Sequence, residues 1–230
     1  NFKNGKRDGK WEYFYKDGSP WKTGAFTNDL KDGVWTIFHE NGTIIIKGKY
    51  INSLEDGKWN TYFSDGTQQD EGFYTKGKMS GFWKGWFTNG QVRYEGTYLN
   101  GNKNGTWKYW NKSGKQELEE TYFEGILNGV RKSWFQNGNL RDEGTYKEGK
   151  QDGLWTFYHD NSRKMMEANY DKGRVNGKVT SYYNIGTLES EKYYVNGIPH
   201  GDFTFYEKQA GKVKQIVKYK RGKKISKEDN

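Results

Sequence analysis

The sequence predicts an all-β fold: an elongated single-layer antiparallel meander of stacked β-hairpins, with about nine 24-residue repeats. Nine glycines recur at intervals of 24 residues, which is typical of repeat architectures. Only 32% of the residues are apolar whereas 18% are aromatic, so the apolar mass is concentrated in large rings that suit a thin sheet. The repeats begin at Gly9, Gly33, Gly57, Gly81, Gly105, Gly129, Gly153, Gly177 and Gly201.

The first repeat shows each element in order. An aromatic-rich run over residues 10–15 predicts a strand, and Asp17-Gly18 predicts a two-residue type I′ turn, because Asp-Gly and Asn-Gly tolerate positive φ at both central positions. A return strand over 20–26 ends in Gly24-Ala25-Phe26, and a polar link leads to the next hairpin. Helix is excluded because a glycine every five to nine residues would cost about 1 kcal/mol each. The translates of these elements predict one continuous repeat domain over 1–230, with a basic C-terminal end at 212–230.

Two columns of aromatic residues are predicted to be structural. With a two-residue turn, Trp11 lies opposite Gly24, and its ring can cover the missing side chain of that glycine. Arg131 and Val179 interrupt the tryptophan column, so the packing of the later repeats is expected to be less regular. The predicted structural residues are Trp11, Trp35, Trp59, Trp83, Trp107 and Trp155, together with Tyr50, Tyr74, Tyr98 and Tyr146.

A third column is aromatic in every repeat and alternates to the opposite face of the sheet. Either these rings only cover the backbone of a thin sheet, or they form an exposed stripe that binds a partner; a one-residue slip in register would exchange the two faces. Trp21 and Ile45 add apolar side chains that the repeat does not require, and we expect them beside the stripe. The predicted partner-binding residues are Phe14, Trp21, Phe38, Ile45, Trp86, Trp110 and Trp134.

The segments 94–107 and 142–155 resemble the MORN repeat, the membrane occupation and recognition nexus motif. Both read Glu-Gly-Thr-Tyr, then a link, then Gly-x-Trp. The 24-residue spacing is similar to that of the bacterial variant, which includes a family of toxin–antitoxin antitoxins. The resemblance implies a β-hairpin scaffold for other proteins, sometimes linked to membranes, and an antitoxin-like role.

No constellation for catalysis, metal binding or a cofactor is predicted. The chain has no cysteine, and its three histidines fall in positions too far apart to share an ion. A column of glutamates, Glu71 and its 24-residue translates up to Glu191, specifies no unique pocket and is expected to pair with Lys and Thr across strands. The segment 72–79 resembles the start of a P-loop but lacks the Ser or Thr for Mg²⁺ and the following helix. We therefore predict a non-enzyme.

Three functions remain open from the sequence. The first is a scaffold that binds another protein, within a larger complex, through an aromatic sheet face. The second is a cell-surface module that binds carbohydrate or cell wall, and the third is weak binding to anionic lipid, since the net charge is +9. No specific nucleic-acid binding is expected, because acidic and basic residues are interspersed along most of the chain. The first residue is Asn1 and not Met, which favours an exported or cell-envelope location over the cytoplasm.

Overall fold

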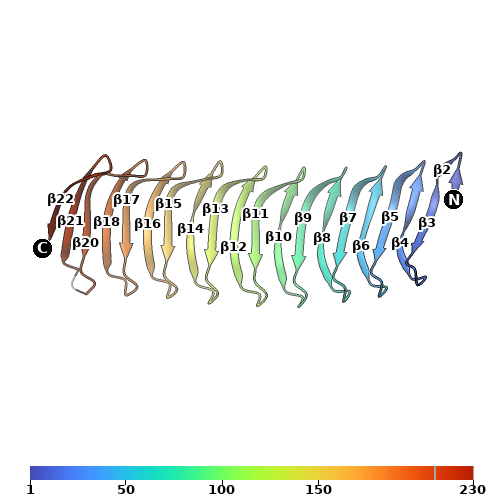
Figure 1. Ribbon diagram of the computed structural model, residues 1–230, viewed down its shortest axis with the longest axis horizontal. Coiled ribbons are helices and arrows are strands. Elements are labelled where there is room, and N and C mark those ends of the chain that lie inside the picture. Colours follow the sequence, from blue (N-terminus) through green and yellow to red (C-terminus); the bar gives the residue numbers. More distant parts are fainter. Residues whose placement is uncertain (210, 230) are drawn as a thin grey trace. The chain divides into compact units, whose positions relative to one another are not determined.

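The computed structural model describes residues 1–209 and 211–229, which divide into two units, Asn1–Lys115 and Gln116–Asn230. Within each unit the strands run antiparallel to their chain neighbours as a meander of hairpins (Figure 1). No helix occurs among the described residues, and so none is present that could cross a membrane. The predicted all-β hairpin meander is confirmed, whereas the single continuous domain over 1–230 stays a prediction.

The first unit contains a short hairpin and four repeats with the first strand of a fifth. Its strands are β1 (Phe2–Lys3), β2 (Lys6–Arg7), β3 (Gly9–Phe14), β4 (Pro20–Thr27), β5 (Leu30–Phe38), β6 (Ile44–Ile51), β7 (Leu54–Tyr62), β8 (Gln68–Thr75), β9 (Lys78–Trp86), β10 (Val92–Leu99) and β11 (Asn102–Trp110). The predicted strands at 10–15 and 20–26 correspond to β3 and β4.

The second unit repeats the same alternation of strands. Its strands are β12 (Gln116–Phe123), β13 (Ile126–Trp134), β14 (Leu140–Lys147), β15 (Lys150–Tyr158), β16 (Lys164–Asp171), β17 (Arg174–Tyr182), β18 (Leu188–Val195), β19 (Ile198–Pro199), β20 (Gly201–Tyr206), β21 (Val213–Lys220) and β22 (Lys223–Asp229). The short β19 and then β20 both pair with β18, so that a single return strand contacts two consecutive segments.

The predicted two-residue turn at Asp17-Gly18 is wrong. Tyr15 N donates to Ser19 O at 2.8 Å, Gly18 N donates to Tyr15 O at 3.1 Å, and among the loop residues only Gly18 has positive φ, at 87°. This is the hydrogen-bond pattern of a three-residue loop that ends in a left-handed glycine. Asp17 adds a side-chain turn, because its Oδ1 accepts from Ser19 N at 2.9 Å.

The predicted register nevertheless holds, because a β-bulge offsets the longer loop. Phe14 lies opposite Pro20, Tyr13 lies opposite Lys22, and Trp21 is left over between them. The three-residue loop moves the register by one residue and the bulge moves it back, so that Trp11 does lie opposite Gly24. The residues of β3 and β4 therefore lie on the faces that the sequence predicts, although the predicted turn is wrong.

Two-residue turns with positive φ at both positions occur instead in the links between repeats. Asn52 and Ser53, for example, have φ of 51° and 67°. The glycines of the 24-residue period lie just after these turns; Gly33 has φ of 80° and falls where the register between β4 and β5 shifts. A side chain at that φ is strained, which explains why glycine recurs at this position.

Five of the six column tryptophans, all but Trp11, cover a glycine of the preceding repeat and not of their own. A Cβ built on Gly24 would lie 2.1 Å from Cδ2 of Trp35, although Gly24 pairs with Trp11. The prediction that Trp11 covers Gly24 is therefore wrong in its choice of ring. Five such pairs, each eleven residues apart, are Gly24–Trp35, Gly48–Trp59, Gly72–Trp83, Gly96–Trp107 and Gly144–Trp155.

The core is an alternating series of these tryptophans and the tyrosine column. Trp59 makes edge-to-face contacts with Tyr50 and Tyr74, with ring centroids 5.3 Å apart in both cases. Trp107 and Trp155 are each only 1% exposed. Such aromatic pairs contribute about 0.5–1.5 kcal/mol beyond their buried area, so they fix neighbouring repeats of the first unit to one another.

Where the second unit lacks a tryptophan, its covered residue changes as well. Arg131 replaces the ring and Glu120 replaces the glycine, and their side chains form an ion pair at 3.5 Å. Asp142, which is 6% exposed, also binds Arg131. Val179 replaces the tryptophan with a smaller side chain, and it lies opposite Ala168, which replaces the glycine and has a Cβ. The departures noted in the sequence are therefore paired substitutions that preserve contact between repeats.

Candidate functional site

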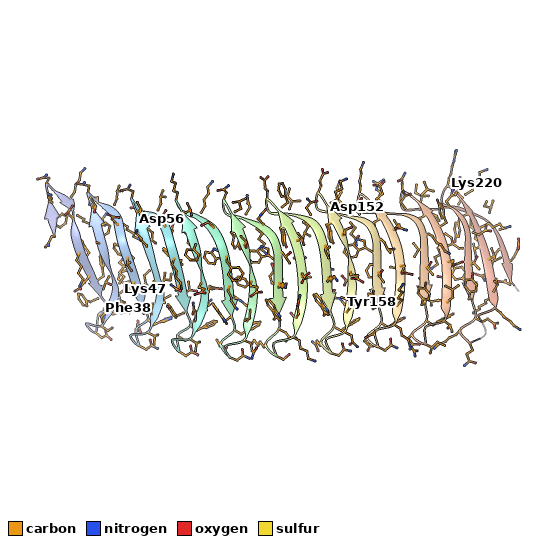
Figure 2. All side chains as sticks on the ribbon, turned by 180° about the vertical axis from the view of Figure 1, so that it is seen from behind. Phe38, Lys47, Asp56, Asp152, Tyr158 and Lys220 are labelled. Carbon is orange, nitrogen blue, oxygen red and sulfur yellow. The ribbon has the colours of Figure 1, made fainter. Side chains whose placement is uncertain are left out.

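The third aromatic column lies on the face away from the tryptophan column. Lys84 Nζ lies 5.8 Å from the Trp86 ring, so these alternate residues of β9 share one face, whereas Trp107 stacks on Tyr109 on the other. Phe38 and Tyr158 lie toward the three-residue loops of their strands, and Asp152 lies toward the two-residue turns (Figure 2).

The predicted partner-binding rings of this column differ in exposure. Phe14 is 56% exposed, and the others are half-buried in their strands. These half-buried residues are Phe38, Trp86, Trp110 and Trp134. Trp134 lies in the second unit, and the other predicted rings of this column lie in the first.

Four of the six tryptophans in the tryptophan column, Trp35, Trp83, Trp107 and Trp155, donate Nε1 to a backbone oxygen, whereas Trp11 and Trp59 make no such bond to a described residue. In the tryptophan column, Nε1 of Trp83 donates to Phe73 O at 3.1 Å, and Nε1 of Trp107 donates to Thr97 O at 3.1 Å. By contrast, Trp86, Trp110 and Trp134 make no hydrogen bond through Nε1 to any described residue, and none of these atoms is both buried and unpaired. These three rings therefore present both apolar surface and an available donor, the combination that favours interfaces.

After Trp134, tyrosines follow in the third column of the second unit, and their hydroxyls are engaged. Tyr158 Oη donates to Glu143 Oε1 at 2.8 Å, and Tyr206 Oη donates to Glu191 Oε2 at 3.1 Å. Burial and the bond to the Glu143 carboxylate raise the pKa of Tyr158 to about 12. These tyrosines are committed to contacts between adjacent repeats.

The glutamate column on this face pairs with lysines, as the sequence predicts. Lys58 Nζ lies 3.3 Å from Glu71, and Lys132 Nζ lies 3.3 Å from Glu143. Lys178 Nζ lies 2.5 Å from Glu191, and this hydrogen bond is the main cause of the lowered pKa of that carboxyl. The charges beside the aromatic stripe are therefore largely compensated.

Trp21 and Ile45 are bulge residues, and Trp21 does not lie with the stripe. The Trp21 ring contacts Tyr13 and Tyr15, with centroids 6.1 Å and 6.3 Å away, and Tyr13 stacks on Trp11. Trp21 is therefore on the tryptophan-column face, whereas Phe14 is on the other. Ile45 is half-buried at the corresponding bulge of the next repeat.

Two exposed rings on the stripe face were missed from the sequence. Phe73 and Phe82 are 46% and 50% exposed, and each is adjacent in sequence to a member of a Gly–Trp pair, so each points away from the tryptophan column. Other repeats carry Thr, Lys or Val at most of these positions. An aromatic ring at a position that is not aromatic in most other repeats is the signal that could have identified them.

The described residues contain no group of three or more His, Asp or Glu side chains arranged to hold a metal ion. The most buried charged cluster is Asp142 with Arg131, Ser133 and Arg141; Arg141 Nε donates to Asp142 Oδ2 at 3.1 Å. Its groups bind one another, so this cluster serves the contact between repeats.

None of the curated proteins compared with the chain matches it. Among solved structures, it is similar to one described as "Crystal Structure of TcdB2-TccC3", at 10% identity and a TM-score of 0.23, over 91% of this chain and 16% of that chain. Four segments, residues 7–28, 31–52, 81–100 and 127–148, match the family model described as the MORN repeat variant. Three of these matched segments lie in the first unit and the fourth lies in the second, so both units contain a segment similar to the MORN repeat variant.

Proposed function

We propose that the chain is a non-enzymatic repeat scaffold that binds another protein through the third-column face. The observation that carries the proposal is the contrast between tryptophans in the same strands. Trp83 and Trp107 are buried with engaged Nε1 atoms, whereas Trp86 and Trp110 are half-buried and make no such bond to any described residue. Binding energy in protein interfaces concentrates in aromatic side chains of this kind.

Anionic-lipid binding is less favoured by the contacts. It needs uncompensated cations, and the lysines beside the stripe pair with glutamates. The antitoxin-like role rests on the sequence resemblance alone, because the matched family model describes only the repeat.

The test uses the full chain as bait in extracts of its source. Wild type, the double variant Trp86→Ala/Trp110→Ala and the control Phe87→Ala are compared, since Phe87 is the residue next to Trp86 and lies outside the stripe. We expect a protein that wild type and the control retain and that the double variant loses while remaining folded by circular dichroism. Equal retention by the folded double variant would assign the stripe to structure alone.

A further inference from the structure

The cluster formed by Tyr13, Tyr15 and Trp21 holds a cation of the protein itself. Lys22 Nζ lies 4.0 Å from the centroid of the Trp21 ring and 4.4 Å from that of Tyr13. The two rings are nearly perpendicular, at 82°. An ammonium over two aromatic faces is the geometry of a cation–π site.

The bulge explains why this site occurs only here. Because Trp21 is the extra residue between Phe14–Pro20 and Tyr13–Lys22, its ring can fold onto Tyr13 beside its own neighbour Lys22. At the equivalent bulges of the following repeats, the residue is aliphatic or polar: Ile45, Gln69, Arg93, Glu117, Arg141, Met165 and Glu189. No other repeat can build the same pair of rings.

Lys22 is held by the rings alone. It forms no ion pair with any described residue, and Trp21 remains 40% exposed. An exposed cation–π contact is worth about 0.5–1 kcal/mol, so a competing cation can displace it. Other lysines that lie near two rings, such as Lys31 over Trp35 and Tyr50, lie against a tryptophan that is 4% exposed.

Acidic groups lie beside this cluster. Tyr15 also lines a hollow of about 460 Å³ with Lys16, Asp17 and Glu40. Neither Asp17 nor Glu40 forms an ion pair with a described residue. The bonds from Ser19 hold the pKa of Asp17 below its ordinary value, so its carboxylate stays charged at neutral pH. A side chain that reached the rings would therefore meet negative charge within the adjoining hollow.

We propose that the Tyr13–Tyr15–Trp21 cluster is a binding site for an organic cation, the guanidinium or ammonium group of a partner's side chain, which Lys22 occupies in the free protein. The partner as the source of the cation rests on the proposed protein-binding function; the cation site itself does not. Lys22 thus acts as an internal competitor that a partner must displace.

The test follows the indole ¹H–¹⁵N signal of Trp21, identified by its loss in Trp21→Leu, during titration with arginine amide against sodium chloride of equal ionic strength. We expect the signal to shift with arginine amide, with binding tightened about two- to five-fold in Lys22→Ala because the competitor is gone. Ile45→Ala, at the equivalent bulge of the next repeat, should bind as wild type does. No shift in Lys22→Ala, or an equal shift with sodium chloride, would overturn the site.

A second titration with tetramethylammonium chloride separates the sources of the cation. This ion can reach the rings but cannot donate hydrogen bonds to Asp17 or Glu40, so we expect weaker binding than for arginine amide. Tighter binding of tetramethylammonium would overturn the assignment to a partner's side chain. Since neither probe needs the partner, failure here is distinct from failure of the Trp86 and Trp110 test.

Discussion

At the residue scale, the contact that defines this repeat is a tryptophan ring lying on a glycine eleven residues earlier. The ring occupies the space of a side chain, since a Cβ on Gly96 would lie 2.2 Å from Cδ2 of Trp107. Glycine and tryptophan are therefore required together, and the second unit changes both partners where it changes one. Ala168 opposite Val179 is the smallest example.

Gly96→Ala should lower the free energy of unfolding by about 1–3 kcal/mol, because the added methyl forces Trp107 to move. In a Trp107→Val background the same substitution should cost little, since the pair then matches Ala168 and Val179. Urea unfolding of the four proteins gives the coupling energy. An equal cost in both backgrounds would show that the ring does not limit the space at Gly96.

Trp59→Ala should cost about 3–5 kcal/mol, as expected for a buried aromatic ring. Trp59 is 8% exposed and contacts two tyrosines. Lys58→Ala removes an exposed side chain and its ion pair with Glu71, so it should change stability by less than about 1 kcal/mol. Chemical denaturation compares the two, and matching midpoints would mean that the two faces are reversed.

At the element scale, the strands and their faces could be predicted from the sequence, whereas the turns could not. Alternation and period place Trp11 opposite Gly24, but Asp17-Gly18 fits both a two-residue and a three-residue loop. The choice depends on the bulge at Trp21, which the side-chain pattern does not mark. For the same reason Trp21 does not lie beside the stripe as the sequence predicts, since a bulge residue does not follow the alternation of a strand.

The three-residue loops are joined to one another by asparagine side chains. Asn89 Nδ2 donates to Lys112 O at 2.7 Å, and Asn41 Nδ2 donates to Ser64 O at 2.9 Å. An aspartate at this position, such as Asp65, still accepts a hydrogen bond from the backbone of its own loop. Its carboxylate has no N–H group to donate to the carbonyl of the next loop.

Asn89→Asp should therefore destabilise the protein by about 0.5–1.5 kcal/mol, the worth of one hydrogen bond. Asp65→Asn is the reciprocal change and should stabilise by a similar amount, because the new amide can donate to the following loop. Thermal unfolding at neutral pH measures both. Opposite signs support the bond between loops, and a loss in both variants would contradict it.

The alkaline limit of stability should reflect the tyrosine–glutamate bonds. The pKa of Tyr158 is raised from 10 to about 12 by burial and by Glu143, so the stability that this bond contributes is complete below pH 10 and is lost as pH rises through about 12. The difference in absorbance at 295 nm between wild type and Tyr158→Phe reports the ionisation of Tyr158, and this difference should titrate near pH 12. A difference that titrates near pH 10 would show that the hydroxyl is free.

At the scale of the whole molecule, we propose different tasks for the two faces of the sheet within the first unit. One face holds the repeats together through Trp83 and Trp107, and the other presents Trp86 and Trp110. The sequence indicated this division through strand alternation alone. It could not identify the available Nε1 atoms, the exposure of Phe73 and Phe82, or the cation over Trp21, because these depend on the spacing between neighbouring strands.

The most direct test compares two double variants, Trp83→Ala/Trp107→Ala and Trp86→Ala/Trp110→Ala, for both unfolding free energy and affinity for the captured partner. We expect the first pair to lose several kcal/mol of stability, whereas the second should stay folded with little loss and bind the partner at least about ten-fold more weakly, which corresponds to about 1.4 kcal/mol. If the second pair lost stability as the first does, or bound the partner with wild-type affinity, the third column would be a second packing layer and the proposed function would be wrong.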